Sequence, residues 1–402
     1  MQPIEIQPSI YWIGVNDQKT KLFEGLWPIE KEGISYNSYL LKGDKNVLVD
    51  LCKETYQDDF LQNLSAIVKP SEIDYLVMNH MEPDHTGALQ RFMQIATETK
   101  IICTKKAVPM IGAFYGIDDR IQAIEDGEKL SLGKMELQFF TAPMVHWPET
   151  MLTYETHTGT LFSCDAFGGY GTVSKGIFDS DYEDLSYFES ESLRYFSNIV
   201  AAFSKPVLNA GKKLENKKIN MIAPSHGLIW KENPGRIIDL YMNWSRFAKG
   251  PAEKSITILY GSMYGNTSSM VPEAVRGIQS QGIPVDVHDV TQTHISYILP
   301  DLWKNQGVMI GAPTYEGSIF PTMALALEMV KYKRIFNRNV TYFGGFGWGG
   351  GAMRYVRAIS ESLDWTLTDS LEFAGRPTHK NAKQVFQLGA DLAKLINSIG
   401  KS

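Results

Sequence analysis

A polar, turn-forming run near residue 250 divides the chain into two stretches with different patterns of apolar residues. It reads Lys249-Gly250-Pro251-Ala252-Glu253-Lys254, and glycine and proline beside charged residues are typical of a boundary between folded units. The chain has 402 residues, which exceeds the size that one hydrophobic core usually serves. We therefore expect two domains, residues 1–252 and 253–402.

After this boundary, apolar strands and amphipathic helices alternate regularly. The strand-like segments are SITILY, VDVHDV, GVMIGAP and NVTYFGG, and helical patterns occupy residues 321–332, 351–363 and 381–398. In the first helix, Met270, Ala274, Val275 and Ile278 share one face. This alternation predicts an α/β fold built on a doubly wound parallel sheet.

The first half is richer in short β-type segments. SYLLKGDKNVLVD predicts a hairpin that turns at Gly43-Asp44, and MLTYETHTGTLFSCD predicts a second that turns at His157-Thr158-Gly159. Helical patterns lie between such strands, as in LQRFMQIA, residues 89–96. We expect a layered α/β sandwich.

Composition excludes several classes of protein. The hydrophobic fraction of 44% and the charged fraction of 21% are those of a folded globular protein, and a net charge of -6 disfavours a nucleic-acid partner. The start of the chain does not resemble a signal peptide, and no apolar run is long enough to cross a bilayer. The three cysteines form no CxxC pair, which disfavours a disulfide framework and an attached rubredoxin module. We expect a cytoplasmic protein without a membrane partner.

The stretch NHMEPDHTG, residues 79–87, follows the apolar strand YLV and concentrates metal-ligand types. Within six residues it carries His80, Glu82, Asp84 and His85. Any one of these residues alone is more often structural than catalytic. Together they favour a metal site, because carboxylates confined in a loop are costly unless a cation or hydrogen bonds compensate them.

Three later residues repeat the pattern of a ligand just beyond a strand. His146 follows MELQFFTAPMV, Asp165 follows LFSC and His226 follows MIAPS. Asp165 could cap a helix instead of binding a metal. The remaining histidines are interpreted as core or surface residues: His157, His288, His294 and His379.

The order and spacing of these residues over about the first 250 positions resemble the metallo-β-lactamase superfamily, an αββα sandwich with the pattern HxHxDH followed by His, Asp and His. Glu82 stands where the superfamily has its second histidine. Nitrogen-rich sites favour zinc, whereas added carboxylate oxygen suits a harder, redox-active metal such as iron. The four histidines and three carboxylates suffice for two irons.

Three loops of the second half predict a flavin site. They follow the first, third and fourth strands, where the doubly wound architecture binds FMN. The first runs from Ser262 to Thr267 and offers hydroxyls and backbone N–H groups for a phosphate. This half resembles flavodoxin. The residues expected around FMN are Ser262, Met263, Tyr264, Gly265, Asn266 and Thr267; Pro313, Thr314, Tyr315, Glu316 and Gly317; and Gly345, Phe346, Gly347, Trp348, Gly349 and Gly350.

The two resemblances together are those of the flavodiiron proteins, also called A-type flavoproteins. The resemblance implies that His80, Glu82 and His146 hold one iron, that Asp84, His85 and His226 hold the other, and that Asp165 bridges them. It also implies reduction of dioxygen to water, of nitric oxide to nitrous oxide, or of both, with electrons passing through FMN to the diiron centre. The donor is expected to be a separate rubredoxin-like protein or a reduced flavin or deazaflavin cofactor, and the assembly a head-to-tail homodimer or a dimer of dimers.

Two other functions remain open on sequence grounds. One is a zinc or iron hydrolase of lactamase type whose flavodoxin half is regulatory, and Glu82 counts against it. The other is an electron-transfer flavodoxin with an inert first domain, which leaves seven aligned ligand-type residues unexplained.

Overall fold

In a computed structural model, residues 2–250 and 252–399 are described, so Pro251 of the predicted linker lies outside the described residues. The chain divides into two compact units between Ser245 and Arg246. The boundary near residue 252 stays a prediction. Among the described helices, none combines the length and the apolar character that a membrane crossing requires.

The first unit is built on two sheets. One has seven strands in the order β1-β2-β7-β8-β9-β10-β11 and the other has five, β12 to β16 in sequence order. The strands of the first sheet are β1 (Ile4–Gln7), β2 (Ile10–Trp12), β7 (Tyr39–Leu41), β8 (Val47–Val49), β9 (Tyr75–Val77), β10 (Lys100–Thr104) and β11 (Ile121–Ile124). Those of the second are β12 (Lys129–Ser131), β13 (Glu136–Thr141), β14 (Met151–Glu155), β15 (Thr160–Cys164) and β16 (Met221–Pro224).

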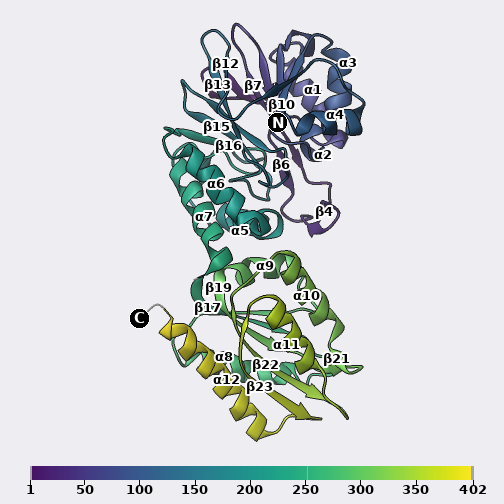
Figure 1. Ribbon diagram of the computed structural model, residues 1–402, viewed down its shortest axis with the longest axis vertical. Helices are drawn as coiled ribbons and strands as arrows, with labels where there is room; N and C mark the ends of the chain where they lie inside the picture. The colour runs from purple at the N-terminus through teal and green to yellow at the C-terminus, as the bar shows by residue number, and fades with distance from the viewer. Residues whose placement is uncertain (1, 251, 400–402) are drawn as a thin grey trace. The chain divides into compact units, whose positions relative to one another are not determined.

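Helices cover the outer faces of both sheets. Figure 1 shows α1, α3 and α4 beside the first sheet and α6 and α7 beside the second. The helices are α1 (Gln57–Ser65), α2 (Pro83–Thr86), α3 (Leu89–Ile95), α4 (Ala107–Tyr115), α5 (Ser186–Tyr195), α6 (Ser204–Leu214) and α7 (Pro234–Arg246). Two small ribbons complete the unit: β3 (Val15–Asp17) with β6 (Ile34–Tyr36), and β4 (Leu22–Phe23) with β5 (Trp27–Pro28).

Both predicted hairpins are confirmed. β7 and β8 pair antiparallel with Leu41 opposite Val47, and β14 and β15 pair antiparallel with Glu155 opposite Thr160. The apolar residues of these short strands are buried because each sheet is covered on both faces. The result is the αββα sandwich that the sequence predicts.

The second unit is a five-stranded parallel sheet in the order β18-β17-β19-β22-β23. Its strands are β17 (Glu253–Tyr260), β18 (Val285–Asp289), β19 (Asn305–Gly311), β22 (Asn339–Phe346) and β23 (Thr366–Ala374), with a small hairpin of β20 (Thr314–Tyr315) and β21 (Ser318–Ile319). Its helices are α8 (Val271–Gln279), α9 (Ile295–Lys304), α10 (Pro321–Tyr332), α11 (Ala352–Ser362) and α12 (His379–Ser398).

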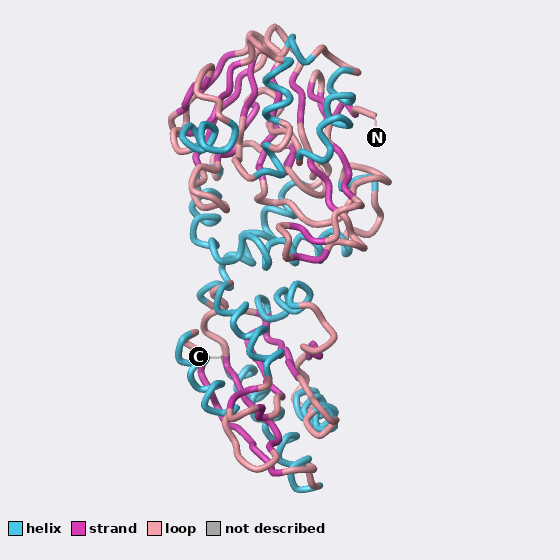
Figure 2. The backbone as a smooth tube through the Cα atoms, turned by 90° about the vertical axis from the view of Figure 1, so that its right-hand side faces the viewer, coloured by secondary structure: helices cyan, strands magenta, loops and turns pink. Residues whose placement is uncertain are grey.

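Helices α8 and α12 cover one face of this sheet and α9, α10 and α11 cover the other. Ala274 and Ile278, on the apolar face predicted for α8, are fully buried against Ile258 of β17 and Leu392 of α12 in one core. Figure 2 shows the strands running between helices in each unit. The doubly wound fold predicted for the second half of the chain is confirmed in its described residues.

Candidate metal centre and flavin site

The seven predicted metal ligands converge at one edge of the first unit, where strands of its two sheets end. His80 follows β9, and Asp84 and His85 lie on the four-residue helix α2, for which Glu82 is the residue before the first turn. His146 lies in the loop between β13 and β14, Asp165 follows β15, and His226 follows β16. Their proximity therefore comes from sheet topology rather than from sequence spacing alone.

Two asparagines hold the sheets together at this edge. The Asn79 backbone carbonyl accepts from the Met151 N–H at 2.9 Å, and its side-chain oxygen accepts from the Thr153 hydroxyl at 2.7 Å. Asn37 donates its side-chain amide to the backbone carbonyl oxygens of Pro224 and Gly227, at 2.9 and 3.0 Å. His80 is the next residue after Asn79, and His226 lies between the two carbonyl groups that Asn37 binds. These links fix both histidines relative to the opposite sheet.

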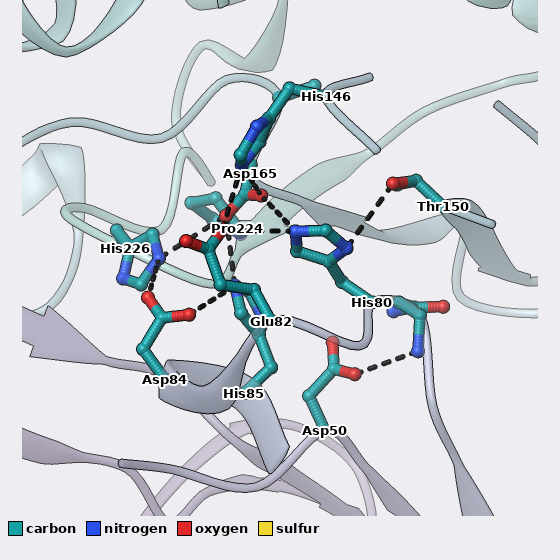
Figure 3. A network of polar contacts seen from close by, with 12 residues as sticks. Asp50, His80, Glu82, Asp84, His85, His146, Thr150, Asp165, Pro224 and His226 are labelled. Carbon is teal, nitrogen blue, oxygen red and sulfur yellow. Dashed lines mark hydrogen bonds and ion pairs between the residues drawn. The ribbon is translucent and has the colours of Figure 1, made fainter. Parts of the chain in front are cut away.

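Three ligands form the first triad, His80, Glu82 and His146 (Figure 3). The Nε2 atoms of His80 and His146 lie 3.3 and 3.0 Å from Glu82 Oε2. The same nitrogens lie 3.4 and 3.3 Å from Asp165 Oδ2. The ligand atoms of these four residues are all within 4.8 Å of one another, which is compatible with a single ion between them.

The second triad is Asp84, His85 and His226. Nε2 of His226 lies 3.3 Å from Asp84 Oδ2, and Nε2 of His85 lies 3.6 Å from Asp84 Oδ1. Asp165 Oδ1 is 3.3 Å from His226 Nε2 and 3.1 Å from His85 Nε2. Asp165 thus directs one carboxylate oxygen to each triad, and its predecessor Cys164 has a φ of 58° where the chain turns into the site.

The chemistry of this cluster fits two metal cations. Among the proposed ligands, five buried atoms lack a hydrogen-bond partner within the described residues: both carboxylate oxygens of Asp84, Asp165 Oδ2, His146 Nε2 and His226 Nε2. Unpaired buried polar atoms are costly. All four imidazoles present Nε2 to carboxylates, so divalent cations satisfy nitrogen and oxygen together, and the three carboxylates favour iron over zinc.

The pKa values of these groups also indicate that the buried carboxylates require nearby positive charge. Burial alone would lower the pKa of His146, but Asp165 and Glu82 raise it to about 10. Burial likewise opposes charge on His226, and Asp165 and Asp84 raise its pKa to about 9. Burial disfavours an ionised Glu82, yet the neighbouring imidazoles lower its pKa below the usual range. Without metal, protons provide the positive charge that the carboxylates require.

Aromatic residues wall the second triad. Phe23, on the β4–β5 ribbon, lies edge-on to His226 at 5.8 Å between ring centroids, and Tyr195, the last residue of α5, lies 5.7 Å from the same ring. Tyr195 is 1% exposed, and its hydroxyl makes no hydrogen bond to any described residue. Burial, followed by the Asp165 and Asp84 carboxylates, raises its pKa. Tyr195 therefore keeps its proton beside the site.

A buried arginine holds this wall in place. The Arg194 guanidinium lies 4.4 Å from the centre of the Tyr170 ring and pairs with Glu191 at 2.6 Å. It also donates to the Pro28 carbonyl at 2.9 Å, which links α5 to the ribbon that carries Phe23. Tyr170 packs between Arg194, Phe23 and Tyr195.

Sequence reasoning missed two buried carboxylates next to the proposed ligands. Glu149 Oε1 lies 2.7 Å from His80 Nδ1, and Asp50 lies close to His85 and Cys164. Asp50 follows strand β8, so the strand-end pattern that identified the other ligands was available for it. Glu149 follows no strand, and nothing local identifies it. Trp147 packs edge-on against the His80 ring, with 5.1 Å between the ring centroids.

The three predicted flavin loops emerge at one edge of the second sheet, because β17, β19 and β22 are adjacent and parallel. Gly265 has a φ of 89° in the first loop. A Cβ on Gly351 would lie 2.1 Å from the Gly317 carbonyl oxygen, so the second and third loops touch. Gly345 and Phe346 are the last residues of β22, and Pro313 is buried. Thr314 and Tyr315 form strand β20, and the remaining predicted residues lie in the loops.

These loops fit a flavin mononucleotide. Trp348 is 98% exposed and Tyr264 is 91% exposed, so both aromatic side chains are open to a planar ligand. Within the described residues, the backbone N–H groups of Asn266 and Thr267 have no hydrogen-bond partner. Free N–H groups in a loop that leads into a helix are suited to a phosphate.

Comparisons with known proteins agree with this architecture. Residues 34–227 match the family described as ODP family beta lactamase, and residues 258–389 match flavodoxin. An anaerobic nitric oxide reductase flavorubredoxin of Vibrio vulnificus is 33% identical over 398 residues, which covers 98% of this chain and 80% of the relative.

Two solved structures resemble the whole chain. The rubredoxin oxygen:oxidoreductase of the anaerobe Desulfovibrio gigas has a TM-score of 0.95 and 25% identity, and the match covers 100% of both chains. The flavodiiron protein of Giardia intestinalis has a TM-score of 0.92 and 27% identity over 99% of this chain and 97% of its own. The chain belongs to the flavodiiron proteins. It is an oxidoreductase that uses FMN and a diiron centre, which supports the predicted function over the hydrolase alternative.

Proposed function

We propose that the protein reduces nitric oxide to nitrous oxide, dioxygen to water, or both, with electrons that enter through FMN. The observation that carries the proposal is Asp165, whose two oxygens face two different triads. Two metal ions joined by one carboxylate are suited to a diatomic substrate that receives electrons from both. The relative named nitric oxide reductase and the structure named oxygen:oxidoreductase support the two gases.

The proposed ligands are those predicted from the sequence, in the two triads joined by Asp165. When bound, FMN accepts electrons and passes them singly, and the diiron centre supplies electrons together with open coordination positions for the gas. The carboxylates of Glu82, Asp84 and Asp165 balance the charge of the metals. The His85 Nε2 atom faces Asp165 Oδ1 at 3.1 Å, and this orientation supports including His85 among the ligands.

The aromatic wall has two proposed roles. Phe23 and Tyr170 exclude water from the side of His226, so that protons reach the substrate only at defined positions. The Tyr195 hydroxyl, which keeps its proton and makes no hydrogen bond to a described residue, donates a hydrogen bond to an oxygen atom of the substrate. Nitric oxide reduction consumes two electrons and two protons per nitrous oxide, and dioxygen reduction consumes four of each.

Separate additions of the two gases test the proposal. Protein loaded with iron and FMN is reduced anaerobically, and one portion receives nitric oxide and another dioxygen. We expect nitrous oxide by gas chromatography, oxygen uptake at an electrode, or both, with reoxidation of the flavin. If fully loaded, fully reduced protein consumes neither gas, the proposed function is wrong.

We also propose that electrons pass between subunits of a head-to-tail homodimer, from the flavin of one to the metal centre of its partner. One variant carries His80→Ala and His146→Ala, and the other carries Thr267→Asp to repel the FMN phosphate. Each homodimer should be nearly inactive with a donor that reacts only through FMN. The purified mixed dimer should recover about half the wild-type rate, because one of two equivalent pairs is intact. An inactive mixed dimer with verified cofactor loading would place transfer within one chain.

A further inference from the structure

The proposed histidine ligands differ in what contacts the ring nitrogen that faces away from the metal. His80 Nδ1 lies 2.7 Å from the Glu149 carboxylate. His226 Nδ1 lies 2.8 Å from the backbone carbonyl oxygen of Ser35. For His85 and His146, no hydrogen bond of Nδ1 is found among the described residues. Among the described residues, one histidine of the four therefore has Nδ1 hydrogen-bonded to a carboxylate, and that histidine belongs to the first triad.

Glu149 is held firmly for this contact. Its side chain is 1% exposed, and the same Oε1 atom accepts the Met81 N–H at 2.9 Å. Its backbone carbonyl accepts from the Thr104 hydroxyl at 2.8 Å. Glu149 Oε2 is buried without a hydrogen-bond partner among the described residues. If Glu149 only held the Met81 N–H in place, an unpaired buried Oε2 atom would be an unnecessary cost. The presence of a carboxylate here is therefore better explained by its contact with His80.

Asp50 does not supply the same contact to the second triad. It lies within 4.8 Å of His85 and Cys164. Its Oδ1 atom accepts the Asn79 N–H at 2.8 Å, and it makes no hydrogen bond to His85 within the part of the chain that the structure describes. Among the described residues, the Nδ1 contacts are therefore the Glu149 carboxylate at 2.7 Å and the Thr150 hydroxyl at 3.4 Å for His80, and the neutral Ser35 carbonyl for His226.

This difference changes the donor strength of the two ligands. An imidazole that donates its N–H to a carboxylate is a more basic ligand at its other nitrogen than one that donates to a carbonyl. Greater basicity and a nearby negative charge both stabilise ferric over ferrous iron. The Glu149 contact also fixes the His80 ring, with Nε2 facing Glu82 and Asp165.

We propose that Glu149 is a positioning residue that makes the two iron positions unequal, so that the iron at the first triad becomes ferric first. The inference rests on the proposed ligand set. In this step one electron leaves the diferrous centre for an external chemical oxidant. No bond breaks, and His80 keeps its Nδ1 proton.

The test compares two substitutions that each remove one buried carboxylate. Glu149→Gln keeps an oxygen that can accept the Met81 N–H but removes the negative charge next to His80. Asp50→Asn keeps an oxygen that can accept the Asn79 N–H but removes the negative charge near His85. Iron-loaded protein is oxidised halfway with ferricyanide and followed by redox potential, electron paramagnetic resonance and Mössbauer spectroscopy. We expect Glu149→Gln to lower the ratio of ferric to ferrous iron at the first triad and to alter the ferric component of the spectra. Asp50→Asn should alter mainly the ferrous component.

A second measurement uses zinc-loaded protein and needs neither iron nor turnover. Proton NMR should show low-field Nδ1–H signals from His80 and His226, and Glu149→Gln should shift only that of His80. If Glu149→Gln changes neither this signal nor the potential, or acts no differently from Asp50→Asn, the inference is wrong although the ligand set stands. If zinc leaves both histidine signals unchanged from metal-free protein, the ligand set itself is wrong.

Discussion

Metal binding should expel protons from the site. In the metal-free protein the pKa of His146 is about 10 and that of His226 is about 9, so both imidazoles carry two protons at pH 7.5. Both must lose a proton before Nε2 can coordinate a metal. We therefore expect at least two protons to be released when both metal positions fill at this pH.

The release sets how affinity depends on pH. Each displaced proton contributes 1.36 kcal/mol per pH unit, so two contribute about 2.7 kcal/mol, or about 100-fold in the overall binding constant. Affinity should rise with this slope from pH 6 to about pH 8. The affinity should stop rising once the pH exceeds the pKa of His226, about 9, and then that of His146, about 10. Above these values the imidazoles are already deprotonated in the metal-free protein. Histidines with an ordinary pKa of about 6.5 would level off near pH 7 instead.

Isothermal titration calorimetry with zinc measures the release directly, in two buffers that differ in heat of ionisation. Zinc is suitable because it does not change oxidation state. His146→Gln should reduce the count by about one proton. His157→Gln is the matched control, because the side chain of His157 is 60% exposed and lies outside the cluster. Release of less than about one proton by the wild type, or no loss of affinity between pH 8 and 6, would refute this account of the site.

Three further substitutions test individual residues. Asp165→Ala should lower the iron content, because one oxygen is lost from each triad, while FMN absorbance persists; two irons with full activity would show a wrong assignment. Glu82→His should shift bound metal from iron toward zinc in cells grown in matched media, and an unchanged metal ratio would contradict the carboxylate argument. Arg194→Met should lower the free energy of unfolding by roughly 3–5 kcal/mol, because Glu191 is left buried without its partner. Denaturant unfolding measures this loss, and adding Glu191→Gln should recover part of it.

Much of the fold and of the proposed ligand set can be predicted from local patterns in the sequence. Apolar segments bounded by turn residues predict strands such as β9 in the first unit and β19 in the second, because period and turn chemistry depend on neighbouring residues. Ligand types directly after such strands, for example His80 and His226, predict a metal site, but β9 and β16 belong to different sheets, so only the packing of the two sheets brings these histidines together. Glu82 indicates iron by its chemistry alone.

The surroundings of the ligands depend on contacts between residues distant in sequence. Glu149 reaches His80 across 69 positions, and Arg194 reaches the Pro28 carbonyl across 166. Neither belongs to a local motif, and a glutamate or arginine is most often at the surface. Only the packing of the two sheets buries Glu149, and only the packing of α5 on the β4–β5 ribbon places Tyr195 and Phe23 beside His226. The sequence therefore determines which atoms can bind metal, whereas the tertiary structure decides how strongly each donates and what shields it from water.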